Sequence, residues 1–324
     1  MEGIYTLAND KVYDQLVALL NSIEANCGDV AVCVIPYNEN IDLVKQEIHQ
    51  RKNVFLFENQ DSLKKWDSFV SQFYEIYYQY PHQGLTTKDT QKVPHSRKYC
   101  AFDGDFKKFV FIDCDTLLFQ PLDHVFSKLD QYDFVVHDFQ RISSLRRKDV
   151  NKYYKIFQTI YDSEDALSLR FHCSGFWASK QGLISKEDLD YFLQELSNGD
   201  VKIFGHWLSE QMVLNYMTLK KNFRLYNFTL DEESAYNTGV CITSKHFEEK
   251  DKILYDGSKE LTYLHYMGIK NERLEKLCQW KKRNIPYNEL LLYLADKLFK
   301  WQLRSVPYRD IFLYYRFLNK RQKV

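Results

Sequence analysis

The stretch FVFIDCDTLLFQPL (residues 109–122) places two carboxylates, Asp113 and Asp115, at the end of an apolar run. If the extended geometry continues, both side chains point to the same side, because side chains alternate along a strand. Two carboxylates this close repel each other unless a cation lies between them. Oxygen ligands suit Mg²⁺ or Mn²⁺, which commonly bridge carboxylates to substrate phosphates. The stretch therefore predicts a metal site for a diphosphate, against the alternative of a solvated turn with two incidental acids.

The first half of the chain alternates between strand and helix patterns. Short runs rich in β-branched and aromatic residues indicate strands, and apolar residues spaced three or four apart indicate helices. We expect strands at 3–8, 30–35, 53–57, 108–113 and 132–138, helices at 12–26, 41–50, 62–79 and 96–102, and a polar loop at 81–94. This alternation predicts an α/β fold, with a mostly parallel sheet flanked by helices. Ligands of such sheets bind at the carboxyl ends of strands, where the two aspartates lie.

Composition excludes several classes of protein. Lys and Arg number 44 and so do Asp and Glu, so no overall positive field attracts nucleic acid. The seven cysteines have no C-x-x-C spacing, which is typical of reduced thiols without a zinc site or disulfide framework. The first residues lack the pattern of a signal peptide, and no apolar run is long enough to span a bilayer. We therefore expect a cytoplasmic protein.

The last 54 residues differ from the rest. Residues 271–324 hold 13 Lys/Arg and 5 Asp/Glu, a net charge of +8, so residues 1–270 carry −8. We expect the chain to divide at this point into a first domain, residues 1–270, and a basic, aromatic-rich C-terminal segment, residues 271–324, of two or three helices. Such a segment suits peripheral contact with an anionic membrane on its inner face. The equal alternative is a helical subdomain packed on the core, with Trp280, Phe299 and Trp301 buried.

Six sequence blocks occur in an order that resembles glycosyltransferase family 8, whose fold is the Rossmann-like GT-A fold. They are YTLANDKVY (5–13), SRKYCAF (96–102), FIDCDTLLFQPL (111–122), FHCSGFWAS (171–179), SEQMVLNYM (209–217) and YLHYMGIK (263–270). The resemblance covers residues 3–268. It implies a hexosyltransferase of polysaccharide biosynthesis that moves a hexose, with retention, from a UDP-sugar to a saccharide or lipid-linked acceptor.

The resemblance also assigns residues to the metal and to the nucleotide. It makes Asp113, Asp115 and His265 the ligands of Mn²⁺ or Mg²⁺. It places the base and ribose of uridine at the turn after the first strand, where a carboxylate can accept the uracil N3–H. The alternative for this turn is a helix N-cap. The residues expected to contact the nucleotide sugar are Thr6, Asn9, Asp10, Arg97, Lys98, Cys114, Ser174, Gly175, Gly268 and Lys270.

Three residues are expected to act in catalysis. Lys98 would stabilise the departing diphosphate, with Arg97 as the alternate, because adjacent residues on a helix point about 100° apart and only one can reach it. In the family an amide, here Gln211, lies on the sugar face opposite the leaving group. Gln211 therefore takes a stabilising role, Glu210 contacts a sugar hydroxyl, and Ser174 and Gly175 shape the acceptor side.

Departures from the family blocks leave two other readings open. Cys173 stands where the family has Asn, Glu210 where it has Asp, and Lys270 follows His265 by five residues instead of six. A catalytically degenerate nucleotide-sugar-binding protein fits these changes. A sugar nucleotidyltransferase is disfavoured because TLANDKVYD lacks the Gly-rich loop it needs. His137, His172 and His206 are interpreted as structural or acceptor-facing.

Overall fold

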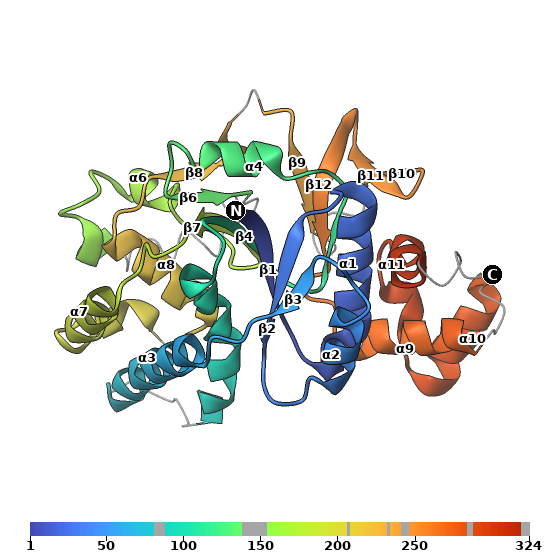
Figure 1. Ribbon diagram of the computed structural model, residues 1–324, viewed down its shortest axis with the longest axis horizontal. Coiled ribbons are helices and arrows are strands. Elements are labelled where there is room, and N and C mark those ends of the chain that lie inside the picture. The colour runs from blue at the N-terminus through green and yellow to red at the C-terminus, as the bar shows by residue number, and fades with distance from the viewer. Residues whose placement is uncertain are drawn as a thin grey trace.

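The computed structural model of the chain describes residues 1–80, 88–137, 154–205, 208–231, 234–240, 246–283 and 288–318. A seven-stranded sheet forms the centre, a smaller sheet adjoins it, and a helical lobe lies at the C-terminal end (Figure 1). In the described residues, no helix combines the length and hydrophobicity that crossing a bilayer requires.

The larger sheet is mixed, with the strand order β3-β2-β1-β4-β7-β6-β8. Its strands are β1 (Glu2–Ala8), β2 (Ala31–Pro36), β3 (Val54–Leu56), β4 (Lys108–Ile112), β6 (Phe134–Val136), β7 (Phe176–Lys180) and β8 (Leu225–Asn227). Strands β3, β2, β1 and β4 run parallel, while β7 is antiparallel to both β4 and β6. The parallel half aligns the carboxyl ends of β1, β2 and β4 at one edge.

The smaller sheet has the order β10-β11-β12-β5, and β9 pairs with β12 outside this path. Its strands are β5 (Thr116–Leu118), β9 (Asn237–Val240), β10 (Glu248–Lys250), β11 (Ile253–Asp256) and β12 (Lys259–His265). Because β5 starts four residues after β4 ends, the chain passes from one sheet to the other within the segment that holds the two aspartates.

Helices cover both faces of the larger sheet. They are α1 (Tyr13–Asn26), α2 (Asp42–Ile48), α3 (Gln60–Gln79), α4 (Asp123–Lys128), α6 (Glu164–Ser168), α7 (Lys186–Ser197) and α8 (Glu210–Lys220). Short 3₁₀ helices are η1 (Asp10–Val12), η2 (Lys88–Asp103), η4 (Asp200–Phe204) and η5 (Phe228–Leu230). The expected helix at 96–102 is thus the last part of a 3₁₀ helix. Of the loop expected at 81–94, residues 81–87 lie outside the described residues and the rest begins η2.

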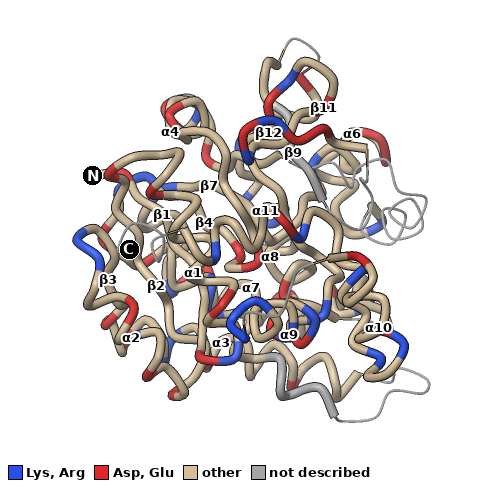
Figure 2. The backbone as a smooth tube through the Cα atoms, turned by 90° about the vertical axis from the view of Figure 1, so that its right-hand side faces the viewer, with Lys and Arg blue, Asp and Glu red and all other residues tan. Residues whose placement is uncertain are grey.

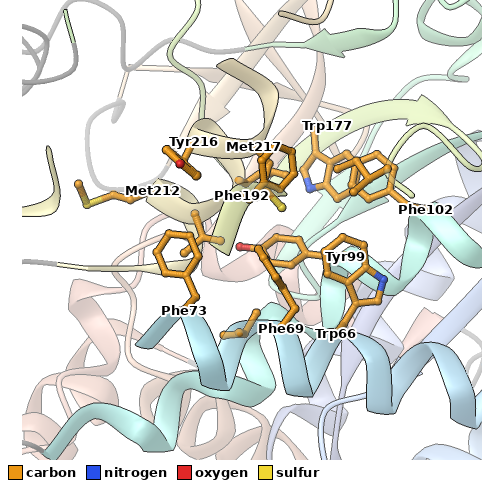
Figure 3. Packing of buried hydrophobic residues seen from close by; sticks show 14 of the residues in the cluster. Trp66, Phe69, Phe73, Tyr99, Phe102, Trp177, Phe192, Met212, Tyr216 and Met217 are labelled. Atoms are coloured by element: carbon orange, nitrogen blue, oxygen red, sulfur yellow. The ribbon is translucent and has the colours of Figure 1, made fainter. Parts of the chain in front are cut away.

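An aromatic core joins α3 and η2 to the sheet (Figure 3). Trp66, Phe69 and Phe73 recur at three and four residues along α3, so they share one face of that helix. They pack in one buried cluster with Tyr99 of η2 and with residues of α7 and α8. On the opposite face of the sheet, α1 and α2 cover an aliphatic cluster. Both clusters hold the carboxyl edge of the sheet in place.

The C-terminal segment packs on the rest of the chain. It forms α9 (Asn271–Lys282), α10 (Glu289–Phe299), η6 (Leu303–Ser305) and α11 (Arg309–Arg316). Trp280 shares a buried cluster with Leu117 of β5 and Leu264 of β12. Buried Arg316 also donates to Asp14 of α1 at 2.5 Å. Of the aromatics expected to be buried in a packed subdomain, Trp280 is buried, Trp301 is half-buried and Phe299 is exposed.

Candidate metal centre

The backbone brings the two aspartates to the junction of the sheets. Ile112, the last residue of β4, pairs with Phe176 of β7, and the N–H of Asp113 then donates to the carbonyl of Gly175 at 2.8 Å. The next strand pairs with the smaller sheet, where Thr116 lies opposite His265. Three segments far apart in the sequence therefore meet within this turn.

Asp113, Asp115 and His265 form one group, with a ligand atom from each lying within 4.8 Å of the others. Nε2 of His265 lies 3.1 Å from Oδ1 of Asp115 and 3.9 Å from Oδ2 of Asp113. The side chain of His265 is 7% exposed. Burial lowers the pKa of His265, but Asp115 and then Asp113 outweigh it and the pKa is raised. Burial raises the pKa of Asp115, but His265 outweighs it and the pKa is lowered.

Gly175 makes this close arrangement possible. A Cβ at this position would lie 2.5 Å from Cε1 of His265 and 3.0 Å from Oδ2 of Asp113. Any other residue would therefore push the imidazole or the carboxylate away from the group.

Lys98 reaches the same group from η2. Its side chain is buried, and Nζ donates to Oδ1 of Asp113 at 3.1 Å and to the carbonyl of Ser174 at 3.3 Å. Oε1 of Glu210 lies 3.9 Å from Nζ. Burial lowers the pKa of Lys98, but Asp113 and Glu210 outweigh it and the pKa is raised. The ammonium group therefore stays charged between two carboxylates.

Glu210 and Gln211 begin α8, whose N-cap is Ser209. Oε1 of Glu210 accepts a hydrogen bond from the hydroxyl of Ser174 at 3.4 Å. Burial raises the pKa of Glu210, but Lys98 outweighs it, helped by His95, and the pKa is lowered. The carboxylate is thus ionised and held beside the metal group.

These side chains line a cavity of about 480 Å³. Eleven of the residues predicted from the sequence lie in its wall: Asn9, Lys98, Asp113, Cys114, Asp115, Ser174, Gly175, Glu210, Gln211, His265 and Gly268. A volume of this size is within the range of small-molecule sites.

Four predicted residues lie outside the lining of the cavity. Oδ1 of Asp10 accepts the N–H of Val44 in the first turn of α2 at 3.2 Å. The N-cap considered for the helix near residue 12 is supplied by Asn9, whose Oδ1 accepts the N–H of Lys11 at 3.1 Å. Arg97 forms an ion pair with Asp67 of α3 at 2.7 Å. The Thr6 hydroxyl is buried without a hydrogen-bond partner in the described part of the chain. Exposed Lys270 precedes α9 as its N-cap residue.

Several lining residues were not predicted from the sequence. Tyr37 and Asn38 follow β2 directly, His95 precedes Lys98 by three residues, and Met267 and Asn271 flank Gly268. The rule that ligands bind at the carboxyl ends of parallel strands would have found Tyr37 and Asn38. His95 has no such signal, because its place depends on the packing of η2.

The remaining histidines are placed as follows. His172 is buried, and Nδ1 lies 2.9 Å from the carbonyl of Cys173, which itself lines the cavity. His137 stacks on Phe228 with ring centroids 4.2 Å apart, and burial lowers its pKa. Both fit the structural interpretation, whereas His206 lies outside the described residues.

The donor set fits a divalent cation. Carboxylate oxygens suit Mg²⁺ and Mn²⁺, and an imidazole nitrogen adds a ligand that Mn²⁺ accepts more readily than Mg²⁺. Lys98 contacts Asp113 and His265 contacts Asp115, so each carboxylate already has a nitrogen neighbour.

The sequence matches no protein-family model and no curated protein. Solved structures do resemble the fold. Mouse xyloside xylosyltransferase 1, in its apo form, has a TM-score of 0.51 at 10% identity over 75% of this chain and 89% of that one. The bifunctional glycosyltransferase WbbM gives 0.49 at 12% identity, over 99% of this chain and 51% of that one. Galactosyltransferase LgtC, solved with donor and acceptor sugar analogues, gives 0.47 at 12%, over 83% and 87%.

The likeness to the xylosyltransferase concerns the fold alone. It confirms the predicted class: a GT-A-like, mixed and mostly parallel sheet flanked by helices, with helices at the C-terminal end. The structural neighbours are glycosyltransferases, and this chain carries an Asp–Asp–His group able to hold a metal ion.

Proposed function

We propose that the protein is a metal-dependent glycosyltransferase. It transfers a hexose from a UDP-sugar to a saccharide or lipid-linked acceptor, with retention of the anomeric configuration. The observation that carries this proposal is the group Asp113, Asp115 and His265 in the wall of a cavity at the carboxyl edge of a GT-A-like sheet.

We assign the metal group and Lys98 to binding the diphosphate of the donor. Asp113, Asp115 and His265 would hold Mn²⁺, which supplies positive charge to the diphosphate when bound. Lys98, fixed by Asp113 and the carbonyl of Ser174, adds a charged donor beside them. Charge on the leaving diphosphate is greatest in the transition state, so a preorganised cation there favours bond breaking.

We assign Glu210 and Gln211 to contacts with the transferred sugar. Glu210 is held by Lys98 and Ser174, so it suits a contact with a sugar hydroxyl better than a role as a free nucleophile. Gln211 lies beside it in the cavity wall and carries a neutral amide. We assign Gln211 the stabilising role on the face opposite the leaving group.

We assign the nucleotide base to the wall of the cavity at the ends of β1 and β2. Asn9 lines the cavity, together with Tyr37 and Asn38, which can stack on a base or bind its edge. The carboxylate of Asp10 is engaged by the N–H of Val44. The preference for uridine therefore rests on the resemblance to glycosyltransferase family 8.

The test is a product analysis with UDP-, GDP- and TDP-hexoses in Mn²⁺. The expected result is slow release of nucleoside diphosphate from a UDP-hexose, because transferases leak to water without an acceptor. Metal-dependent binding without any release from these donors would favour the degenerate sugar-binding protein, which the Cys173 departure supports. Release of pyrophosphate from a sugar phosphate and UTP would favour a nucleotidyltransferase.

A further inference from the structure

Asn215 is a buried polar side chain in the middle of α8 that the proposed function leaves without a role. It is 2% exposed. Asparagine is unfavourable inside helices, because its amide competes with the backbone for hydrogen bonds. Asn215 follows Gln211 by four residues, so both side chains lie on the same face of α8. The contacts of this face therefore show what the amide is used for.

The amide of Asn215 pairs with the backbone of His172. Oδ1 accepts the N–H of His172 at 3.0 Å, and Nδ2 donates to the carbonyl of His172 at 2.8 Å. Nδ2 also donates to the carbonyl of Gln211 at 2.8 Å. A side-chain amide carries a donor and an acceptor like those of a peptide group, so Asn215 holds His172 as a neighbouring strand would.

The ring of His172 is fixed as well. Nδ1 lies 2.9 Å from the carbonyl of Cys173, and the ring centroid lies 4.7 Å from that of Phe134 in β6. The residue is fully buried. His172 is therefore held through both its backbone and its side chain.

The three residues after this position, 173–175, contact the metal group through their backbone. The carbonyl of Ser174 accepts a hydrogen bond from Lys98 at 3.3 Å. The carbonyl of Gly175 accepts the N–H of Asp113 at 2.8 Å. The position of this short segment therefore decides where the Asp113 backbone and the Lys98 ammonium group lie.

This segment is anchored at both of its ends. Phe176, which follows it, pairs with Ile112 in the ladder between β4 and β7. His172, which precedes it, is bound by Asn215. One anchor is thus the sheet itself, and the other is a single side chain of α8.

We propose that Asn215 is a positioning residue, which clamps His172 and so keeps residues 173–175 in place beside Asp113 and Lys98. Asn215 is not among the described residues that line the cavity, so it acts through this segment and not on a substrate. Its effect on catalysis rests on the proposed function. There the clamp keeps the charge of Lys98 where it acts on the departing diphosphate.

Removing the amide would release one end of the segment. The N–H and carbonyl of His172 would lose their partner, and because unpaired buried polar groups are costly, the backbone would shift to find others. The carbonyl of Ser174 would then move away from Lys98. An Asn215 that only stabilised the fold would instead lower the melting temperature and leave these contacts as they are.

The clamp consists of neutral groups. Figure 2 shows charged positions on the C-terminal helices α9 and α10, whereas the amide of Asn215 and the peptide groups of His172 carry no charge. Salt screens interactions between exposed charges and affects buried ones much less. The effect of Asn215 on the segment should therefore be the same at about 0.1 M and about 1 M salt.

The experiment follows the segment in the full chain without any substrate. Cys173 is 9% exposed, and its alkylation by iodoacetamide, measured by peptide mass spectrometry, reports opening of residues 173–175. Half-buried Cys33 of β2 is the internal reference. In Asn215→Ala, alkylation of Cys173 is expected to rise about 10-fold or more relative to Cys33, because local opening exposes the thiol. Hydrogen exchange at the amide of Asp113 should rise with it.

The matched control is Asn21→Ala, which makes the same substitution at an equally buried asparagine. Asn21 of α1 is 2% exposed and donates to the carbonyl of Tyr315 at 2.6 Å. Its loss should lower the melting temperature without changing either readout. If Asn215→Ala does not fold, Asn215→Leu gives the same test, because it keeps a branched side chain and removes the hydrogen bonds.

Two results would overturn the proposal. One is unchanged alkylation of Cys173 and unchanged exchange at Asp113 in a folded Asn215 variant. The other is an equal rise of both in Asn21→Ala, which would make Asn215 merely structural. Neither readout uses transferase activity, so each decides the clamp even if the proposed function fails.

Kinetics with a UDP-hexose and Mn²⁺ test the catalytic consequence separately. In Asn215→Ala, kcat is expected to fall about 10-fold with a smaller change in KM, because Lys98 acts mainly on the transition state. Asn21→Ala should keep the wild-type kcat. An unchanged kcat in a variant whose segment has opened would refute the positioning of Lys98. No release of nucleoside diphosphate by the wild type would instead count against the proposed function alone.

Discussion

Gly175 decides, at the scale of single residues, whether the metal group can assemble. The variant Gly175→Ala would place a methyl group 2.5 Å from Cε1 of His265 and force the imidazole away from Asp115. We expect the stabilisation by Mn²⁺ plus UDP to be lost in a melting experiment, at an overpacking cost of about 1–3 kcal/mol. The control Gly257→Ala meets no atom within 4 Å, although its φ of +61° is strained. It should be destabilised yet keep the whole metal response. A normal metal response in Gly175→Ala would show that His265 is not a ligand.

Lys98 and Arg97 are neighbours in sequence with different surroundings. Lys98 lies in the cavity wall, while Arg97 pairs with Asp67 and also donates to the carbonyl of Pro36. We expect Lys98→Ala to lower kcat about 100-fold or more with a smaller change in KM, because its charge acts mainly on the transition state. Arg97→Ala should mainly lower the melting temperature. Steady-state kinetics of both variants would refute the assignment if only KM changed in Lys98→Ala.

Asp133 connects three neighbouring strands, β6, β7 and β8, through its ion pairs. It precedes β6, accepts from Lys180 of β7 at 3.1 Å, and pairs with Arg224 just before β8. Burial raises its pKa, but the hydrogen bonds from Arg224 and Lys180 outweigh it and lower the pKa to about 2.

This carboxylate should therefore make stability depend on pH. An Asp whose folded pKa lies below its unfolded value of about 3.9 stabilises the fold above that value, and the contribution is lost as pH falls towards 2. The loss of melting temperature caused by Asp133→Asn should be full at pH 6 and shrink between pH 4 and 2. Asp190→Asn removes an exposed carboxylate with no ion pair among the described residues, so its effect should be small throughout. A constant difference between wild type and Asp133→Asn across this range would contradict the argument.

The ion pair of Asp14 with Arg316 joins α1 to α11. Both side chains are buried, so Asp14→Asn leaves the guanidinium uncompensated. Breaking a buried pair in this way costs about 3–5 kcal/mol. Lys282 pairs with the same carboxylate from a more exposed position, and Lys282→Gln should cost about 0–1 kcal/mol. Denaturant unfolding of the two variants measures the difference, and equal costs would mean that Arg316 contributes little to holding the lobe.

Individual strands and helices were predictable from the sequence because each depends on the spacing of apolar residues within its own segment. The strands β1, β2 and β4 and the helix α1 all lie within two residues of their expected ranges. Asp113 and Asp115 were found because an apolar run ending in acids is a local signal. His265 was found through the resemblance alone, since its pairing opposite Thr116 joins segments about 150 residues apart.

Features that depend on packing were not predictable in this way. Strand β7 lies between β4 and β6, so it pairs with strands that are distant in the sequence. The sequences of these strands do not indicate which of them pair. The carboxylate of Asp10 could cap either of two helices. It caps α2 and not the helix that directly follows it in the sequence. The neighbourhood of Arg97 likewise depends on where α3 places Asp67.

In the whole molecule, the C-terminal lobe packs on the rest of the chain. Its helices share a buried cluster with β5 and β12, although composition alone left a packed subdomain and a membrane segment as equal alternatives. A truncation after residue 270 should therefore be insoluble or unfolded, because it exposes Leu117, Leu264 and Tyr266. A truncated chain that melted cooperatively at the full-length temperature would instead support residues 1–270 as an independent domain.

The central claim is that Asp113, Asp115 and His265 form a metal site for the diphosphate of a nucleotide sugar. The most direct measurement is the melting temperature with UDP, in Mn²⁺ and in EDTA, for the wild type and for Asp115→Ala. Ligand at 100 times its Kd stabilises a protein by about 2.7 kcal/mol. We expect UDP to raise the melting temperature of the wild type in Mn²⁺ but hardly in EDTA, and the metal effect to be absent in a folded Asp115→Ala. Equal stabilisation by UDP in Mn²⁺ and in EDTA would contradict the account.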